Sequence, residues 1–159
     1  MSVSNPTERR SPMGTQENKA SASRFLEEVI NRGNVALIDE LSAPNFVDHQ
    51  TPPGVPPGIE GIKTYISMFR AAFPDLHYTI EDSIAEGDRV VQRTSAHGTM
   101  QGDFMGMSAS GKAATWSEIH ITRYTDGKAV EHWAVVDQLG MLAQLGFAQA
   151  PSQPAGVAG

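Results

Sequence analysis

The dipeptide Asp126-Gly127 most constrains the fold, because it lies between two runs rich in β-forming residues. A two-residue hairpin turn needs positive φ at both central positions, and Asp-Gly adopts that geometry readily. The dipeptide therefore predicts two paired strands over residues 116–125 and 128–137. A regular ladder would pair Thr125 with Lys128, then His120 with Trp133, and finally Trp116 with Asp137.

This register divides the hairpin into two faces, since strand side chains alternate. The first face carries Trp116, Glu118, His120, Trp133 and Asp137. The second face carries Ile119, Ile121, Val130, Ala134 and Val136, with Arg123 and His132 among them. The first face is too aromatic for a solvated surface and too polar for a plain core, so it predicts the wall of a ligand pocket. Each residue alone also has a structural explanation, such as Asp137 capping a helix that begins at Gln138.

The 159 residues predict a single domain with a modest core, over residues 21–147. Residues 1–20 are polar and show no helical or strand period, so we expect a disordered leader. Residues 148–159 are rich in Pro, Ala and Gly and predict a disordered tail.

Apolar spacing predicts helices over residues 21–32 and 59–73, a short helix after Asn34, and a closing helix over residues 138–145. Strands are expected over residues 45–50, 76–86 and 89–100. The last two join at Gly87-Asp88, a register that pairs Tyr78 with His97. A glycine-rich crossing over residues 102–112 follows.

This order predicts an α+β fold, because neither hairpin leaves room for a crossover helix. We expect a curved, mostly antiparallel sheet with the N-terminal helices packed on its concave face. A cone-shaped cavity between the two layers is the expected site.

Composition narrows the classes of partner. The net charge is −6, and no cluster of Lys and Arg could neutralise several phosphates, so nucleic acid is not expected. No apolar run of about 18 residues predicts a membrane span. The chain contains no cysteine, which excludes disulfides and thiolate sites and fits a cytoplasmic protein.

Four segments carry a resemblance to a known family: AFPDLHYTIEDSIAEGDRVVQRTSAHGTMQGDFMGM, SGK, RYTDGKAVEHW and VVDQLGMLAQLG. Together, from about Phe25 to Gly146, they resemble the SnoaL-like polyketide cyclase or ester cyclase family, whose members have the NTF2-like fold. The resemblance implies a cofactor-independent enzyme. Such an enzyme closes a ring by intramolecular aldol condensation of a polyketide ester, with an aspartate as general acid and base.

On this chain the resemblance puts that aspartate at Asp137, with His120 assisting. Candidate substrate-binding residues are Trp116, Glu118 and Trp133 from the predicted pocket face, Phe69 from the third helix, Phe104 from the crossing and, from the resemblance, His49 at the end of the strand over residues 45–50. Removing a proton next to a carbonyl requires a partly desolvated base and a donor for the enolate oxygen. Asp137→Asn is therefore expected to lower turnover by roughly a hundredfold.

Other functions fit the same cavity. A hydrolase could use Glu118 and Asp137 around an activated water, although the nearby cation, Arg93, is expected to pair with Asp82. A ketosteroid-isomerase-like proton shuttle and a noncatalytic binder of small molecules also remain open. No metal is expected, because the His, Asp and Glu residues lack a recurring ligand motif.

The second face of the hairpin has no helix left to cover it once the helices close the other side. An uncovered apolar face of that breadth predicts a homo-oligomer, a dimer or tetramer. The expected partners are thus a second copy of the chain and a small hydrophobic or polyketide-like substrate.

Overall fold

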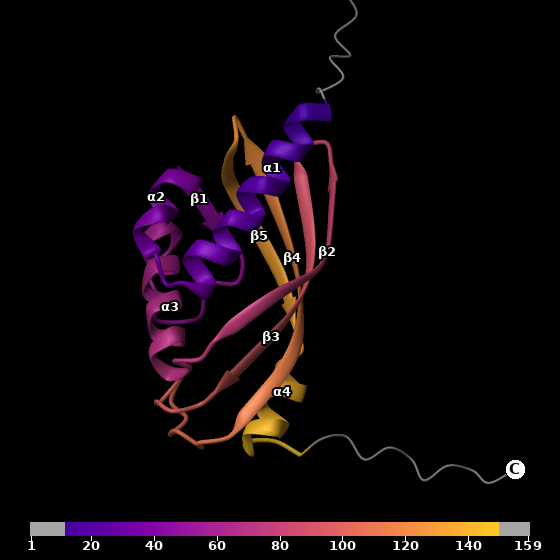
Figure 1. Ribbon diagram of the computed structural model, residues 1–159. Coiled ribbons are helices and arrows are strands. Elements are labelled where there is room, and N and C mark those ends of the chain that lie inside the picture. The colour runs from indigo at the N-terminus through magenta and orange to yellow at the C-terminus, as the bar shows by residue number, and fades with distance from the viewer. Residues whose placement is uncertain (1–11, 150–159) are drawn as a thin grey trace, which may run out of the picture.

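A curved five-stranded sheet organises residues 12–149, the part of the chain that the computed structural model describes. The elements in order are α1 (Pro12–Arg24), the π-helix η1 (Phe25–Asn31), the 3-10 helix η2 (Val35–Leu37), α2 (Ile38–Leu41), β1 (Ser42–Asp48), α3 (Gly58–Ala72), β2 (His77–Glu86), β3 (Arg89–Thr99), β4 (Ala113–Thr125), β5 (Lys128–Val136) and α4 (Gln138–Leu145). Helices α1, α2 and α3 lie on one side of the sheet, and α4 lies at its lower end (Figure 1). The predicted α+β fold is confirmed.

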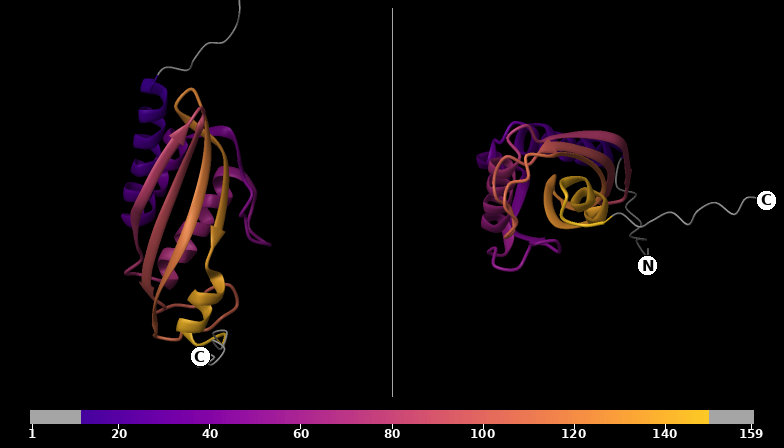
Figure 2. Two further views of the ribbon diagram at one scale, coloured as in Figure 1. Left: turned by 90° about the vertical axis from the view of Figure 1, so that its right-hand side faces the viewer. Right: turned by 90° about the horizontal axis from the view of Figure 1, so that it is seen from below.

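The strand order is β1-β5-β4-β3-β2. Neighbouring strands are antiparallel except β1 and β5, which run parallel. Seen from below, the sheet curls around the space beside the helices (Figure 2). The edge strand β1 pairs with β5, and each paired residue of β1 lies more than eighty positions before its partner in the sequence.

The N-terminal helix begins earlier than predicted. α1 starts at Pro12 and continues into η1, so the expected disordered leader is wrong from residue 12 onward. The helix packs on β2 and β3 and buries Asn18 and Ala22. The rest of the leader and most of the tail lie outside the described residues. None of the helices between residues 12 and 149 is long and apolar enough to cross a bilayer.

The predicted hairpin turn is confirmed, because Asp126 and Gly127 have φ of 51° and 76°. Thr125 pairs with Lys128 and Tyr124 with Ala129, as expected, but Arg123 then pairs with Glu131. Val130 is therefore an extra residue, a β-bulge that shifts β5 by one position. A shift of one residue turns every later side chain of β5 to the other face.

A second bulge lies in β2. Asp82 pairs with Arg93 as predicted, but Tyr78 pairs with Ala96 rather than His97. The register shifts between Ile80 and Asp82, which leaves Glu81 as the extra residue. Tyr78 consequently points into the buried side of the sheet, where 6% of its surface remains exposed.

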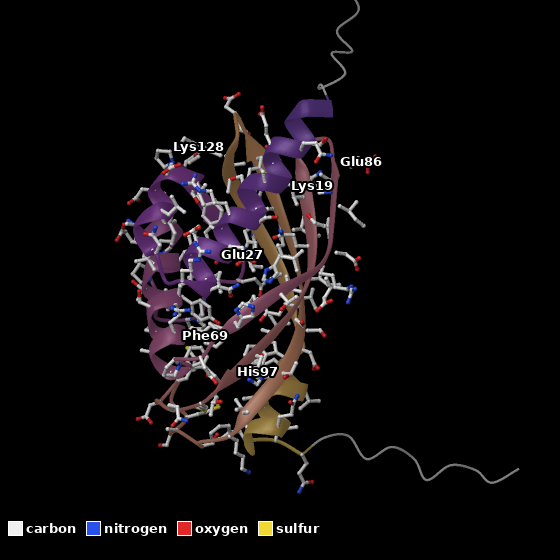
Figure 3. The ribbon with its side chains drawn as sticks, viewed as in Figure 1. Lys19, Glu27, Phe69, Glu86, His97 and Lys128 are labelled. Atoms are coloured by element: carbon white, nitrogen blue, oxygen red, sulfur yellow. The ribbon has the colours of Figure 1, made fainter. Side chains whose placement is uncertain are left out.

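Two apolar clusters fill the space between the sheet and the helices. The first contains Phe69, Phe73, Phe104, Trp116, Met141 and Leu145, among others. The second contains Val29, Ile38, Phe46, Ile62, Tyr124 and Ala129, among others. Phe69, labelled in Figure 3, lies 6.0 Å from Trp116 between ring centroids, so α3 and β4 meet in the first cluster.

Gly61 gives a test of how closely the loop before α3 packs on that helix. A Cβ at this position would overlap the carbonyl oxygen of Pro56. We expect Gly61→Ala to lower the free energy of unfolding by about 2 kcal/mol or more, because backbone must move. Gly14→Ala in α1, where nothing lies within 4 Å, is the control and should raise it by about 0.5 kcal/mol. Urea denaturation measures both, and an unchanged stability of Gly61→Ala would contradict the packing.

Candidate active site

A cavity of about 620 Å³ lies between the inner face of the sheet and the helices. This volume suits a ligand of several fused or linked rings. Apolar side chains of both clusters line its two ends, and a band of polar side chains crosses the sheet between them. The polar band contains Asp48, Tyr78, Gln92, Glu118, His120 and His132.

The carboxylate of Glu118 is the most buried charge of the band, with 6% of its surface exposed. Its Oε1 accepts hydrogen bonds from Trp116 Nε1 at 2.6 Å and from Tyr78 Oη at 2.7 Å. Burial alone would raise the pKa of Glu118, but its contact with His120 and these two donors hold the pKa below its ordinary value. Glu118 is therefore ionised at neutral pH.

Two histidines connect this carboxylate to a second one. His120 Nδ1 lies 3.1 Å from His132 Nε2, and His132 Nδ1 lies 2.9 Å from Asp48 Oδ1. Burial would raise the pKa of Asp48, but the hydrogen bond and charge of His132, with the backbone N–H of Gln50, lower it. His120 Nε2 lies 3.0 Å from Glu118 Oε2, a charge contact rather than an aligned hydrogen bond.

These contacts fix most of the protons. An ionised Asp48 only accepts, so His132 Nδ1 carries a hydrogen. His132 Nε2 then accepts from His120 Nδ1–H when His132 is neutral. His120 Nε2 is the one nitrogen of these two rings without a hydrogen-bond partner, and it lies beside the carboxylate of Glu118.

Tyr65 and Tyr78, which line the cavity near these carboxylates and histidines, stay protonated. Burial, together with the negative charges of Glu118 and Asp48, raises the pKa of Tyr65 to about 12. Burial and the neighbouring Glu118 also raise the pKa of Tyr78 well above its ordinary value. Both hydroxyls are therefore hydrogen-bond donors at neutral pH and not bases.

Six of the predicted site residues line the cavity. They are His49, Phe69, Phe104, Trp116, Glu118 and His120. Phe69 and Phe104 stack with 5.0 Å between ring centroids, so the glycine-rich crossing packs into one end of the cavity. His49 lies at the rim, where its ring stacks on Trp133 at 4.9 Å and its Nε2 lies 2.8 Å from Glu131 Oε1.

The predicted positions of Trp133 and Asp137 on the pocket face are wrong. The bulge at Val130 pairs Trp133 with Ile121, which turns its ring to the outer face. Asp137 follows the end of β5 and caps α4, with Oδ1 accepting from Gly140 N at 2.9 Å. Its side chain is exposed and does not line the cavity. A catalytic role for Asp137 stays a prediction, and the local structure explains the residue as a helix cap.

Four polar residues that were not predicted as site residues also line the cavity: Asp48, Tyr78, Gln92 and His132. The bulge that turns Trp133 away from the cavity turns His132 toward it. The bulge in β2 likewise turns Tyr78 toward the cavity. Asp48 lies in the strand that was expected over residues 45–50, with no role in the site predicted for it. Its parallel pairing with His132 joins residues that no local pattern connects.

The charges on the cavity wall are all carboxylates or histidines. No Lys or Arg lies among the lining residues of the described chain. Within residues 12–149, no group of three or more His, Asp or Glu side chains converges closely enough to hold a metal ion. The wall can therefore exchange protons with a ligand and accept hydrogen bonds from it, but it offers no fixed cation to a ligand carboxylate.

Comparisons with known proteins agree with this architecture. A family model described as SnoaL-like polyketide cyclase matches residues 20–145. TsrD from Streptomyces laurentii is 30% identical with a TM-score of 0.76, over 86% of this chain and 98% of that one. A candidate polyketide cyclase from Bacillus cereus is 33% identical with a TM-score of 0.75, over 87% and 86%. AclR, a candidate hydroxylase from Streptomyces galilaeus, is 31% identical with a TM-score of 0.72, over 83% and 97%. No curated protein matches the chain.

The lowered pKa of Glu118 predicts a pH-dependent stability. A folded-state pKa below the unfolded value stabilises the protein above about pH 4, and this stabilisation is lost as the pH falls through the folded pKa. We expect Glu118→Gln to flatten the loss of unfolding free energy between about pH 5 and 3, and to destabilise by about 1–3 kcal/mol at pH 7. Urea unfolding across this range measures both.

The control is Glu86→Gln, an exposed carboxylate at the end of β2 (Figure 3). It should leave the pH dependence unchanged. An equal pH dependence in wild type and Glu118→Gln would contradict the prediction.

Proposed function

Because the chain belongs to the SnoaL-like polyketide cyclase family, we propose that it is a cofactor-independent acid/base enzyme for a small, neutral, polyketide-like substrate. The observation that carries the proposal is the row of contacting side chains Glu118–His120–His132–Asp48 inside a cavity whose wall is mostly apolar. The absence of Lys and Arg from the described wall favours an ester or ketone over a free acid, since a buried carboxylate would lack a counter-ion.

The proposed reaction is an intramolecular aldol closure. His120 Nε2 takes the proton from the carbon next to a carbonyl, and the electron pair of that C–H bond forms an enolate. The enolate carbon attacks a second carbonyl carbon, a C–C bond forms, and the resulting alkoxide takes the proton back from His120. No proton or electron is gained or lost overall. The neighbouring Glu118 stabilises the imidazolium between the two transfers.

His132 and Asp48 are positioning residues in this proposal. The carboxylate of Asp48 orients His132, and His132 Nε2 orients His120 through Nδ1. This arrangement keeps His120 Nε2 as the nitrogen that faces the reacting proton. An orienting carboxylate behind a histidine is a recurrent device in acid/base catalysis.

A test of the proposal does not need the natural substrate. The probe is 2-tetralone in D₂O, whose exchange of protons next to the carbonyl is followed by NMR. We expect the wild type to accelerate exchange and His120→Asn to lose about a hundredfold or more of that acceleration, the usual scale of general acid/base catalysis. His97→Asn, an exposed histidine on the outer face of β3, is the matched control and should exchange as fast as wild type (Figure 3).

Asp137→Asn discriminates the two candidate bases in the same assay. Asparagine is as good a helix cap as aspartate, so the fold should be retained. We expect a change of less than about threefold in exchange if His120 is the base. A loss near a hundredfold in Asp137→Asn, with His120→Asn unaffected, would instead support the aspartate.

A hydrolase is the second candidate. It is favoured by two carboxylates on either side of the histidine pair, Glu118, which is buried, and Asp48, which is partly buried. Arg93 does not serve such a site, because it lies on the outer face and binds Asp82 at 2.6 Å. Release of an acid from an ester probe, without exchange of the adjacent protons, would favour this reaction. Binding of the probe with neither reaction would favour a noncatalytic binding protein.

We also propose that the outer face of the sheet forms a homodimer. With the observed register, its apolar residues include Ile84, Ile119 and Val135, which are 65%, 45% and 74% exposed. Ile121 and Trp133 pair beside them on the same face. A broad exposed apolar surface of this kind marks an interface more often than a solvated surface.

Light scattering tests the dimer. We expect a mass of twice 17.1 kDa at micromolar concentration, and a mass of one chain for Val135→Glu, because a buried unpaired carboxylate opposes association. Met68→Glu, an equally apolar but separate exposed position on α3, is the control and should remain dimeric. A wild-type monomer at that concentration would contradict the proposal.

Two further expectations stay predictions. The reaction above needs no cofactor, because all its proton transfers use side chains of the cavity. A cytoplasmic location is expected from the cysteine-free composition.

A further inference from the structure

Three buried side-chain polar atoms in residues 12–149 lack a hydrogen-bond partner. They are Ser83 Oγ, Gln92 Nε2 and His120 Nε2. The strand register places them in one row, because Ser83 pairs with Gln92 and Gln92 pairs with His120. Side chains of such pairs share a face, so Ser83, Gln92 and His120 lie in one row across the inner face of the sheet.

Gln92 is the central member of the row. Only 6% of its surface is exposed, and it lines the cavity beside His120. A buried amide N–H without a partner costs about as much as a lost hydrogen bond, and native proteins rarely retain one without a reason. Leucine or methionine at this position would fill a similar volume without that loss.

We propose that Gln92 Nε2 binds a carbonyl oxygen of the substrate, next to the nitrogen that removes the proton. The amide donates to the oxygen on which the enolate charge develops, while His120 Nε2 faces the adjacent C–H. Gln92 has no charge, so it stabilises the enolate oxygen without favouring a carboxylate in the ground state. The ligand recognised is thus a neutral ketone or ester, held by an acceptor oxygen.

Two rival explanations give different results. Gln92 could hold a bound water, or it could bond Ser83 after a small rotation and serve the fold alone. In either case the amide contributes to stability, and its removal lowers the melting temperature. In the proposed site the amide is unpaired until a ligand binds, so its removal stabilises the free protein.

The first experiment measures the melting temperature of the ligand-free full chain. We expect Gln92→Leu to raise it by about 2–6 °C, since an unpaired buried polar group is replaced by an apolar one. Thr94→Val is the matched control on the same face of β3. Thr94 is buried outside the cavity wall and its hydroxyl donates to the carbonyl of Glu118 at 3.5 Å, so its removal should not stabilise the protein. A lower melting temperature of Gln92→Leu would overturn the proposal in favour of a water or Ser83.

The second experiment compares two probes of similar shape, 2-acetylnaphthalene and 2-isopropylnaphthalene, by ligand-observed NMR titration. We expect wild type and Thr94→Val to prefer the ketone, and Gln92→Leu to lose roughly 3- to 10-fold in affinity for the ketone alone. A wild type with no preference for the ketone, including no binding of it, overturns the proposal. So does an unchanged preference in Gln92→Leu.

The inference rests on the proposed function only for the identity of the reacting carbonyl, and the two can fail separately. Loss of ketone preference in Gln92→Leu with no proton exchange in wild type would keep the carbonyl site and reject the acid/base enzyme. Proton exchange that depends on His120 but not on Gln92 would keep the acid/base enzyme and reject the carbonyl site.

Discussion

The buried carboxylate of Glu118 is the constraint on which the polar half of the structure depends. An unpaired charge at this depth would cost several kcal/mol, so the surrounding elements must supply donors. β4 contributes Trp116 and His120, and β2 contributes Tyr78. His120 in turn requires His132 from β5, which is held by Asp48 from β1. One charge thereby orients side chains on four of the five strands.

Much of the fold was predictable because its signals are local. The Asp-Gly turn, the helical apolar spacing before Pro74 and the glycine after α4 each specify a boundary through backbone geometry. The start of α1 was not predictable in this way. Residues 12–20 show almost no apolar stripe, and the helix gains its stability by packing on β2 and β3, which the local sequence does not reveal.

The site was less predictable than the fold, because the face of a strand depends on counting residues from the turn. A single extra residue at Val130 exchanges Trp133 for His132 on the cavity wall. Both Ala129 and Val130 fit a regular strand, so nothing in the sequence marks the bulge. β4 precedes the turn and keeps its regular alternation, which is why Trp116, Glu118 and His120 were placed correctly. Asp48 reaches the site through a pairing that spans most of the domain.

A buried polar group without a partner destabilises a fold, and the polar band contains two such atoms, Gln92 Nε2 and His120 Nε2. Replacing Gln92 or the Glu118–His120 pair with well-packed apolar residues would leave fewer buried polar groups without hydrogen-bond partners. Buried polar groups without hydrogen-bond partners are expected at functional sites, where such groups stay unpaired until a ligand binds. In this sheet the unpartnered atoms of Ser83, Gln92 and His120 belong to residues in one row. A low-dielectric cavity also strengthens each hydrogen bond the ligand makes, so few polar groups are enough to orient it.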